Sequence, residues 1–209
     1  MSMGRLEKLL VNSKGRQRSR VEQARRMLAS VPLEGARDYL EVGCGTGAVT
    51  RFAASELGLR AIGIDIDPEQ IATARSDAAG VASVRFAEAD AARLPFEDGS
   101  FDVVLSFMAT HHIGDPDAAL GEVARVLRPG GHFVYADILL PAAVARVGRV
   151  LGHGYRLPRS EGLLASLAAA GFATVWASRT GERFYGKYEA VLRRDSDQQM
   201  TQMRTDRLD

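Results

Sequence analysis

Leu-Glu-Val-Gly-Cys-Gly-Thr-Gly-Ala-Val-Thr, residues 40–50, is the stretch from which the fold follows. An apolar run ending at Val42 meets three glycines spaced two residues apart, and apolar residues at helical spacing follow at Val49, Phe52 and Leu57. This order predicts a strand, a tight glycine turn and a helix. Glycine suits such a turn because it tolerates positive φ and lets a ligand approach the backbone. In open α/β sheets, turns of this kind bind nucleotides.

Apolar runs and helical patterns alternate along the rest of the chain, which predicts an α/β fold with a mainly parallel sheet and helices on both faces. After the first strand, further strands are expected at 60–65, 84–88, 101–107, 132–138, 172–178 and 185–192. Helices are expected at 18–31 and after Gly47, Asp67-Pro68, Asp115-Pro116 and Ser160. The last two strands are joined near Gly181 by a connection too short for a parallel crossover, so they should form an antiparallel hairpin.

Composition limits the classes of protein to consider. The chain has 209 residues, 46% of them apolar, which is enough for one α/β domain of ordinary size. With 27 basic and 26 acidic residues, no global charge favours nucleic acid as a partner. Cys44 is the only cysteine, so no internal disulfide can form and a reducing compartment fits. No apolar run reaches the ~20 residues of a membrane span. We therefore expect a cytoplasmic protein without a membrane span.

The glycine turn alone leaves the ligand open. Gly43-x-Gly45-x-x-Ala48 also satisfies the dinucleotide fingerprint, which favours a nicotinamide-dependent oxidoreductase. Asp65 follows Gly43 by 22 residues, close to the place of a carboxylate that binds ribose hydroxyls. NAD and S-adenosylmethionine both carry such a ribose, so Asp65 suits either cofactor. A glycine turn that binds nothing is a third interpretation.

Four stretches in one order resemble the class I S-adenosylmethionine-dependent methyltransferases, in particular the group that acts on small molecules. They are residues 41–47, 63–68, 89–104 and 125–131. The resemblance implies a Rossmann-like, doubly wound, seven-stranded sheet and methyl transfer from S-adenosylmethionine to a small-molecule acceptor by in-line displacement. It also implies three parts: a basic helical lid segment at 1–35, a cofactor-binding domain at 36–194 and a polar tail at 195–209.

The resemblance places eleven residues at the cofactor: Glu41, Gly43, Cys44, Gly45, Gly47, Asp65, Ile66, Asp90, Ala91, Ser106 and Phe107. The glycines would lie along its methionine and ribose part, with Cys44 as a small filler in the turn. Asp65 would accept from the ribose hydroxyls and Asp90 from the adenine amino group, because an ionised carboxylate only accepts hydrogen bonds. Ile66 and Ala91 would bracket the ring. Glu41 would lie near the α-amino group, or else only brace the glycine turn.

Candidates for the chemistry are fewer. His111 is the predicted general base, because an imidazole can remove a proton near neutral pH; the alternative is a histidine that only packs or caps the backbone. His112, His153 and Tyr155 are predicted to face the acceptor. No metal site is predicted. The competing functions are an oxidoreductase and a non-catalytic scaffold that binds the cofactor. The basic N-terminal helix could instead contact an anionic surface or RNA, although the net charge of +1 argues against nucleic acid.

Overall fold

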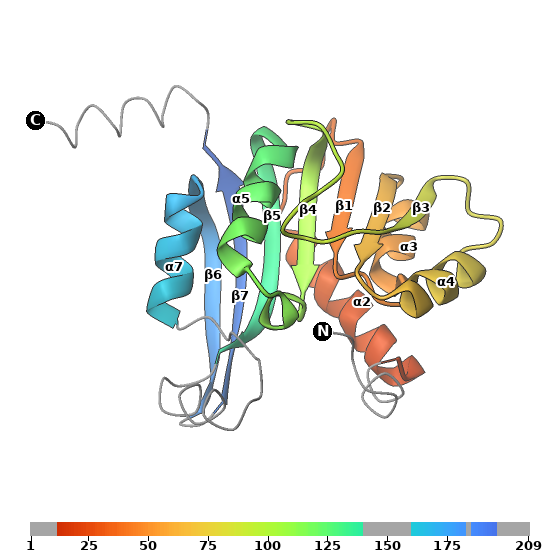
Figure 1. Cartoon of the computed structure of the whole chain (residues 1–209), viewed down its shortest axis with the longest axis horizontal. Coiled ribbons are helices and arrows are strands. Elements are labelled where there is room, and N and C mark those ends of the chain that lie inside the picture. The colour runs from red at the N-terminus through yellow and green to blue at the C-terminus, as the bar shows by residue number, and fades with distance from the viewer. Residues whose placement is uncertain (1–11, 140–159, 183–184, 196–209) are drawn as a thin grey trace, which may run out of the picture.

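The computed structural model of the protein describes residues 12–139, 160–182 and 185–195, and its strands form one seven-stranded sheet in the order β3-β2-β1-β4-β5-β7-β6 (Figure 1). The strands are β1 (Asp38–Val42), β2 (Arg60–Asp65), β3 (Val84–Glu88), β4 (Phe101–Phe107), β5 (Leu127–Leu139), β6 (Phe172–Glu182) and β7 (Tyr185–Arg194). The first five pair in parallel, and β7 runs antiparallel to both β5 and β6. The predicted mixed sheet with a C-terminal hairpin is confirmed.

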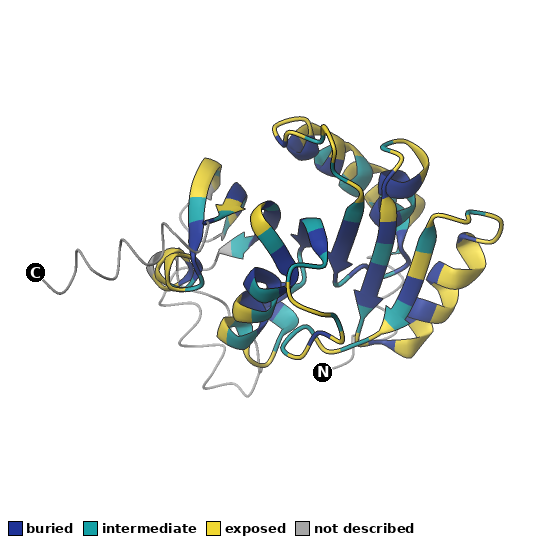
Figure 2. Ribbon diagram, turned by 90° about the horizontal axis from the view of Figure 1, so that it is seen from above, coloured by how far each residue is buried: buried dark blue, intermediate teal, exposed yellow. Residues whose placement is uncertain are grey.

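Helices cover both faces of this sheet. They are α2 (Lys14–Leu28), α3 (Ala48–Ser55), α4 (Pro68–Asp77), α5 (Pro116–Val126), α7 (Ser160–Ala169) and the 3₁₀ turn η1 (Thr110–His112). α5 and α7 pack on one face, and α2 and α3 pack on the other (Figure 1). The central strands are buried between these layers, while the outer surfaces of the helices are exposed (Figure 2). This is the burial pattern of a parallel sheet with both faces covered.

Two helices begin where the aspartate–proline pairs predict. The Asp67 carboxylate accepts from the Glu69 and Gln70 amides, with Pro68 at the first helical position of α4. Asp115 does the same for Ala118 at the start of α5. Such caps satisfy amides that have no partner within the helix. These two caps therefore determine the residues at which α4 and α5 begin, after the chain has passed the carboxyl ends of β2 and β4.

Three predicted boundaries are wrong. α2 begins at Lys14 and ends at Leu28, because the segment up to Val31 continues in tighter turns that keep Val31 buried. β5 begins at Leu127, since the chain pairs with β4 across a register shift before it reaches the glycines at 130–131. β6 continues past its predicted end at 178 to Glu182, with Gly181 paired to Gly186 of β7, while the connection to β7 stays near Gly181 as expected.

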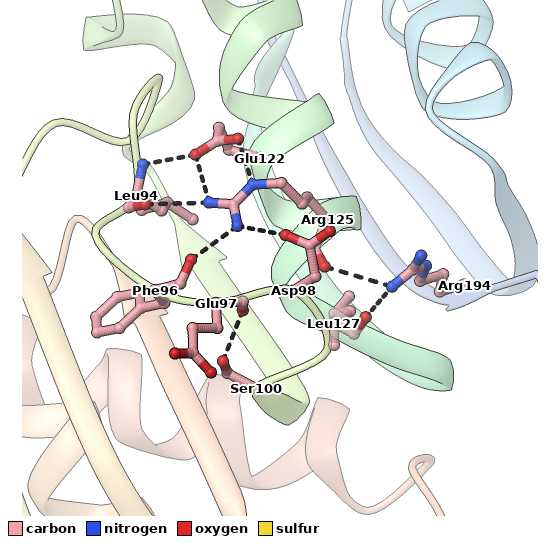
Figure 3. Close-up of polar contacts among 9 residues, drawn as sticks. All are labelled: Leu94, Phe96, Glu97, Asp98, Ser100, Glu122, Arg125, Leu127 and Arg194. Atoms are coloured by element: carbon pink, nitrogen blue, oxygen red, sulfur yellow. Dashed lines mark hydrogen bonds and ion pairs between the residues drawn. The ribbon is translucent and has the colours of Figure 1, made fainter.

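Arg125 of α5 fastens the loop that follows β3 (Figure 3). Its guanidinium donates to the Leu94 carbonyl at 3.0 Å, to the Phe96 carbonyl at 2.7 Å and to Asp98 at 2.8 Å. Glu122 binds the same guanidinium and accepts from the Leu94 amide at 2.7 Å. One helix therefore holds the part of the loop from Leu94 to Asp98, which follows the segment that carries Asp90.

Candidate functional site

A cavity of about 310 Å³ opens at the carboxyl ends of β1, β2 and β3. Its lining comes from the glycine turn, the ends of β2 and β3, and the segment around η1. The lining residues are Val42, Gly43, Ile64, Asp65, Ile66, Asp67, Ala89, Asp90, Ala91, Ala109, His112, Ile113 and Gly114. We call this the first cavity. It lies beside the boundary between β1 and β4, where the strand order reverses and where open α/β sheets bind ligands.

The glycine turn brings backbone to the wall of the first cavity. Gly43 has φ +74°, and a Cβ added there would lie 2.3 Å from the Cβ of Ala109. The amides of Gly43 and Cys44 both donate to the Ile64 carbonyl at 2.9 Å, which ties the turn to β2. The first turn residue therefore has to be glycine for two reasons, its left-handed backbone and the absence of space for a side chain.

Asp65 is half-buried at the end of β2, where it both shapes the turn and lines the cavity. One carboxylate oxygen accepts from the Gly45 amide at 2.9 Å, and the other accepts from the Asp67 amide at 3.0 Å. Because each carboxylate oxygen can accept more than one hydrogen bond, these contacts leave capacity for a ligand hydroxyl. Asp65 thus lines the first cavity, and its predicted contact with ribose hydroxyls stays a prediction.

The far wall of the first cavity combines an apolar side chain with a second acid. Ile66 is 55% exposed and presents its side chain to this wall. Asp90 is exposed in the loop after β3, and one of its oxygens accepts from the Ala92 amide at 2.9 Å. Ala91 lies beside Asp90 in the same wall. The apolar side chains could pack against the face of a flat ring, and the carboxylate could accept a hydrogen bond from a donor at the edge of that ring.

Glu41 lies outside the first cavity, buried beneath the glycine turn. Its carboxylate accepts a hydrogen bond from the Thr50 hydroxyl of α3. Burial raises the pKa of Glu41 to about 7, with Thr50 and the nearby Arg20 acting in the opposite direction. Glu41 and Arg20 face a small cavity of about 20 Å³ together with Cys44. Arg20, from α2, is a functional candidate that the sequence did not single out.

Besides Glu41, five predicted cofactor residues do not line the first cavity, namely Cys44, Gly45, Gly47, Ser106 and Phe107. The Cys44 side chain packs with Ile71 and Phe86 between the turn and α4, and burial raises the pKa of its thiol well above the usual range. It is a filler, as expected. Ser106 and Phe107 are both buried at the end of β4, and Phe107 packs into the core beneath α2 and α3. Neither of them lines a cavity, so any contact with the cofactor would have to be indirect.

His111 is buried in η1 and is held by a carboxylate of β5. Its Nδ1 lies 2.6 Å from an oxygen of Asp137, and its backbone amide donates to the other oxygen at 3.2 Å. Asp137 is itself fully buried. Its neighbour His112 lines the first cavity instead. The predicted His153 and Tyr155 lie outside the described residues. Asp137 was missed because a contact between two elements leaves no local mark in the sequence.

A second cavity of about 330 Å³ lies between α2 and the ends of β5 and β7. It is lined by Arg16, Ser19, Arg20, Gln23, Met108, Ala136, Asp137, Lys187, Tyr188 and Glu189. Met108, directly after β4, has φ +55° and donates from its amide to the Ala136 carbonyl at 2.7 Å. Both cavities therefore border the segment 108–112. In the part of the chain that the structure describes, no group of three or more acidic, histidine or cysteine side chains could hold a metal.

Comparison with known proteins agrees with this geometry. A family model described as a methyltransferase domain matches residues 40–135. The demethylmenaquinone methyltransferase of Thermus thermophilus is 35% identical over 178 residues, which cover 71% of this chain and 80% of that protein. The 2-methyl-6-phytyl-1,4-hydroquinone methyltransferase of Synechocystis is 42% identical over 98 residues, 47% of this chain. Of that longer relative the chain spans only 31%.

Among solved structures, the [4+2]-cyclase SpnF is similar throughout. The TM-score is 0.75 at 23% sequence identity, over 88% of this chain and 85% of SpnF. At that level of identity the likeness shows the fold and nothing further. Among the described residues, no helix is both long and apolar enough to cross a bilayer.

Proposed function

Because this chain belongs to the class I S-adenosylmethionine-dependent methyltransferases, we propose that it transfers the cofactor's methyl group to a small-molecule acceptor by in-line displacement. The observation that carries the proposal is the pair Asp65 and Asp90, which face one cavity from the ends of neighbouring strands beside a turn that admits only glycine. An oxidoreductase fits less well, because the sheet ends in an antiparallel hairpin and a second acid follows β3.

The residues of the first cavity fit S-adenosylmethionine. In this proposal Asp65 accepts from the ribose hydroxyls and Asp90 from the adenine amino group, and the exposed Ile66 side chain lies against the ring; their common cavity supports it. Glu41 and Arg20 supply one negative and one positive group beneath the turn, which matches the ammonium and carboxylate of the methionine end. When bound, the cofactor supplies an electrophilic methyl group on a positively charged sulfur. The chain then has to align the acceptor and exclude water.

His111 is the general base of this proposal, and Asp137 positions it. A carboxylate at Nδ1 favours the tautomer that carries its proton there, so Nε2 is the nitrogen left to accept a proton. The same carboxylate stabilises the imidazolium that forms when the acceptor's hydroxyl or amine loses its proton. The contact to the His111 amide fixes the main chain as well, so side chain and backbone are oriented by one group.

Transfer of radiolabel tests the activity. The protein would be incubated with methyl-tritiated S-adenosylmethionine and a panel of hydroxylated, amine and thiol acceptors that includes demethylmenaquinone, on which the Thermus relative is named as acting. We expect label in at least one acceptor, with one S-adenosylhomocysteine formed for each methyl transferred. Tight cofactor binding without transfer to any member would favour the scaffold.

The role of His111 as general base is tested with an acceptor that the radiolabel assay identifies. His111→Gln should lower kcat by roughly 10²–10⁴-fold, the usual contribution of a general base, with cofactor affinity unchanged. Asp137→Asn should lower kcat less, because His111 stays in place while the imidazolium loses its charged partner. His132→Gln, at the opposite end of β5, is the matched control. Near-normal turnover by His111→Gln would end the assignment.

A further inference from the structure

The second cavity has a charge balance that the first cavity lacks. Three cationic side chains reach it, Arg16 and Arg20 from α2 and Lys187 from β7. Two carboxylates, Asp137 and Glu189, reach it as well. Cavities that bind small molecules commonly fix their ligand with a few placed polar groups. Charged side chains that already have hydrogen-bond or ion-pair partners in the protein are less available to a ligand. The remaining ones therefore indicate the charge of the ligand that the cavity would bind.

Both carboxylates are engaged within the protein. Asp137 accepts from the His111 amide and from the Ile138 amide, and it contacts the His111 ring. Glu189 accepts from Gln23 at 2.8 Å and pairs with Arg26 at 3.2 Å. Both acids therefore already have hydrogen-bond or ion-pair partners within the protein.

The cationic side chains of the second cavity have fewer partners within the protein than its two carboxylates. Within residues 12–139, 160–182 and 185–195, no hydrogen bond or ion pair is formed by Arg16 or Lys187. Arg20 is half-buried and interacts electrostatically with Glu41 on the side of the glycine turn. Arg16 and Lys187 thus face one cavity from two different elements with their charges uncompensated, an arrangement that favours an anion between them.

The position of this cavity relates it to the reaction. Asp137, which lines it, is the group that holds His111, and Met108, which also lines it, precedes the segment of η1. A molecule bound there lies beside the carboxylate that holds the proposed base and beside the start of segment 108–112, which also borders the first cavity. We therefore assign the second cavity to the acceptor.

We propose that the acceptor carries an anionic group, a carboxylate or a phosphate, which Arg16 and Lys187 bind in the second cavity. The proposal rests on the proposed function, since it names the acceptor class for that reaction. Both kinds of anion offer oxygens to the two cations, and Arg16 can donate two parallel hydrogen bonds to either. The remaining lining, with Met108 and Ala136, suits a small apolar body attached to that group.

Calorimetric binding to the protein saturated with S-adenosylhomocysteine tests this inference. The probes are benzoate, phenyl phosphate and the neutral benzamide. We expect at least one anion to bind about tenfold more tightly than benzamide and to weaken as salt is added, because the cations are partly exposed. Arg16→Gln and Lys187→Gln should each weaken that anion about fivefold, as for a partly exposed charged contact. Arg18→Gln, an exposed arginine of α2 outside the cavity, is the matched control.

Three results would overturn the inference: benzamide binding as tightly as the anions, binding unchanged in both variants, or no anion binding to the loaded protein. Each leaves the proposed function standing, since S-adenosylhomocysteine binding is measured first in the same samples. If S-adenosylhomocysteine itself does not bind, the proposed function fails instead. The two failures are thus distinguished before any anion is added.

Discussion

Glu41 shows how one buried carboxyl makes the stability of the protein depend on pH. The side chain is 4% exposed, and burial raises its pKa from an ordinary value of 4.5 to about 7. Between these two values the folded chain holds a proton that the unfolded chain has released. The free energy of unfolding therefore decreases as the pH rises from about 4.5 to about 7. At one pKa unit per ~1.4 kcal/mol, this loss amounts to about 3 kcal/mol.

Glu41→Gln removes this dependence. We expect the variant to be more stable than the wild-type chain at pH 8 by up to about 3 kcal/mol and similar to it at pH 5, in urea unfolding of the cofactor-free protein. Glu97→Gln, which changes an exposed carboxyl, controls for the loss of one charge. Parallel pH dependence in the wild-type chain and Glu41→Gln would show that the buried carboxyl does not control stability.

Single functional residues can be predicted from the sequence when their position follows from the neighbouring residues along the chain. Gly43 and Asp65 could be predicted because a strand–turn–helix pattern places both at one edge of the sheet. Asp137 and Arg20 could not, because each acts through a partner on a distant element. Asp137 meets His111 across 26 residues, and Arg20 approaches Glu41 from another helix. Ser106 was placed at the cofactor by the resemblance alone; the side chain is buried at the end of β4, and its role stays a prediction.

Among elements, α5 acts as the support of the loop that carries Asp90. Arg125 contacts the Leu94 and Phe96 carbonyls while Glu122 holds the Leu94 amide (Figure 3). A planar guanidinium can make these contacts at once, whereas a lysine ammonium cannot reproduce their geometry. The helix therefore fixes the course of the loop just after the residue proposed to bind adenine.

Arg125→Lys is expected to loosen this loop. Loss of the forked contacts should lower the free energy of unfolding by about 1–3 kcal/mol, the range for hydrogen bonds to a charged group. Affinity for S-adenosylmethionine should decrease while kcat at saturation changes little, because the acceptor side is untouched. Arg93→Lys, an exposed arginine of the same loop, is the control. Unchanged cofactor affinity in a folded Arg125→Lys variant would contradict the supporting role.

Elements were predicted well where periodicity and caps act together. β2, β3 and β4 have the expected limits, and α4 and α5 begin at their aspartate–proline pairs. The start of β5 could not be predicted, because pairing from Leu127 depends on a register shift against β4. β6 runs to Glu182, beyond the end predicted at 178, because glycine usually weakens a strand, yet here Gly181 pairs with another glycine, Gly186.

Across the whole molecule, both cavities lie around one segment at the carboxyl edge of the sheet. The strand order reverses between β1 and β4, and the segment 108–112 follows β4 at that point. α2 contributes Ala24, Met27 and Leu28 to the core and Arg16 and Arg20 to the cavities. Folding of this helix and formation of the binding surfaces are therefore coupled, and a bound cofactor should stabilise the chain as a whole.

Thermal unfolding measures this coupling. A ligand at 100 times its Kd adds about 2.7 kcal/mol to the free energy of unfolding, which for a chain of this size raises Tm by roughly 5–10 °C. We expect that shift with S-adenosylmethionine and S-adenosylhomocysteine and none with NADH or NADPH. A shift with the nicotinamides alone would assign the first cavity to the other cofactor class.

Gly43→Ala gives this measurement its internal control. The added Cβ would meet the Ala109 Cβ at 2.3 Å, so the turn has to move and the shift with S-adenosylmethionine should be lost. Gly80→Ala places the same methyl group at a similarly left-handed position, φ +90°, where nothing lies within 4 Å. Both variants carry the backbone strain of about 1–2 kcal/mol, but only Gly43→Ala carries the clash. Gly80→Ala should therefore keep the full shift from a lower starting Tm, and an equal loss in both variants would mean that strain rather than contact governs binding.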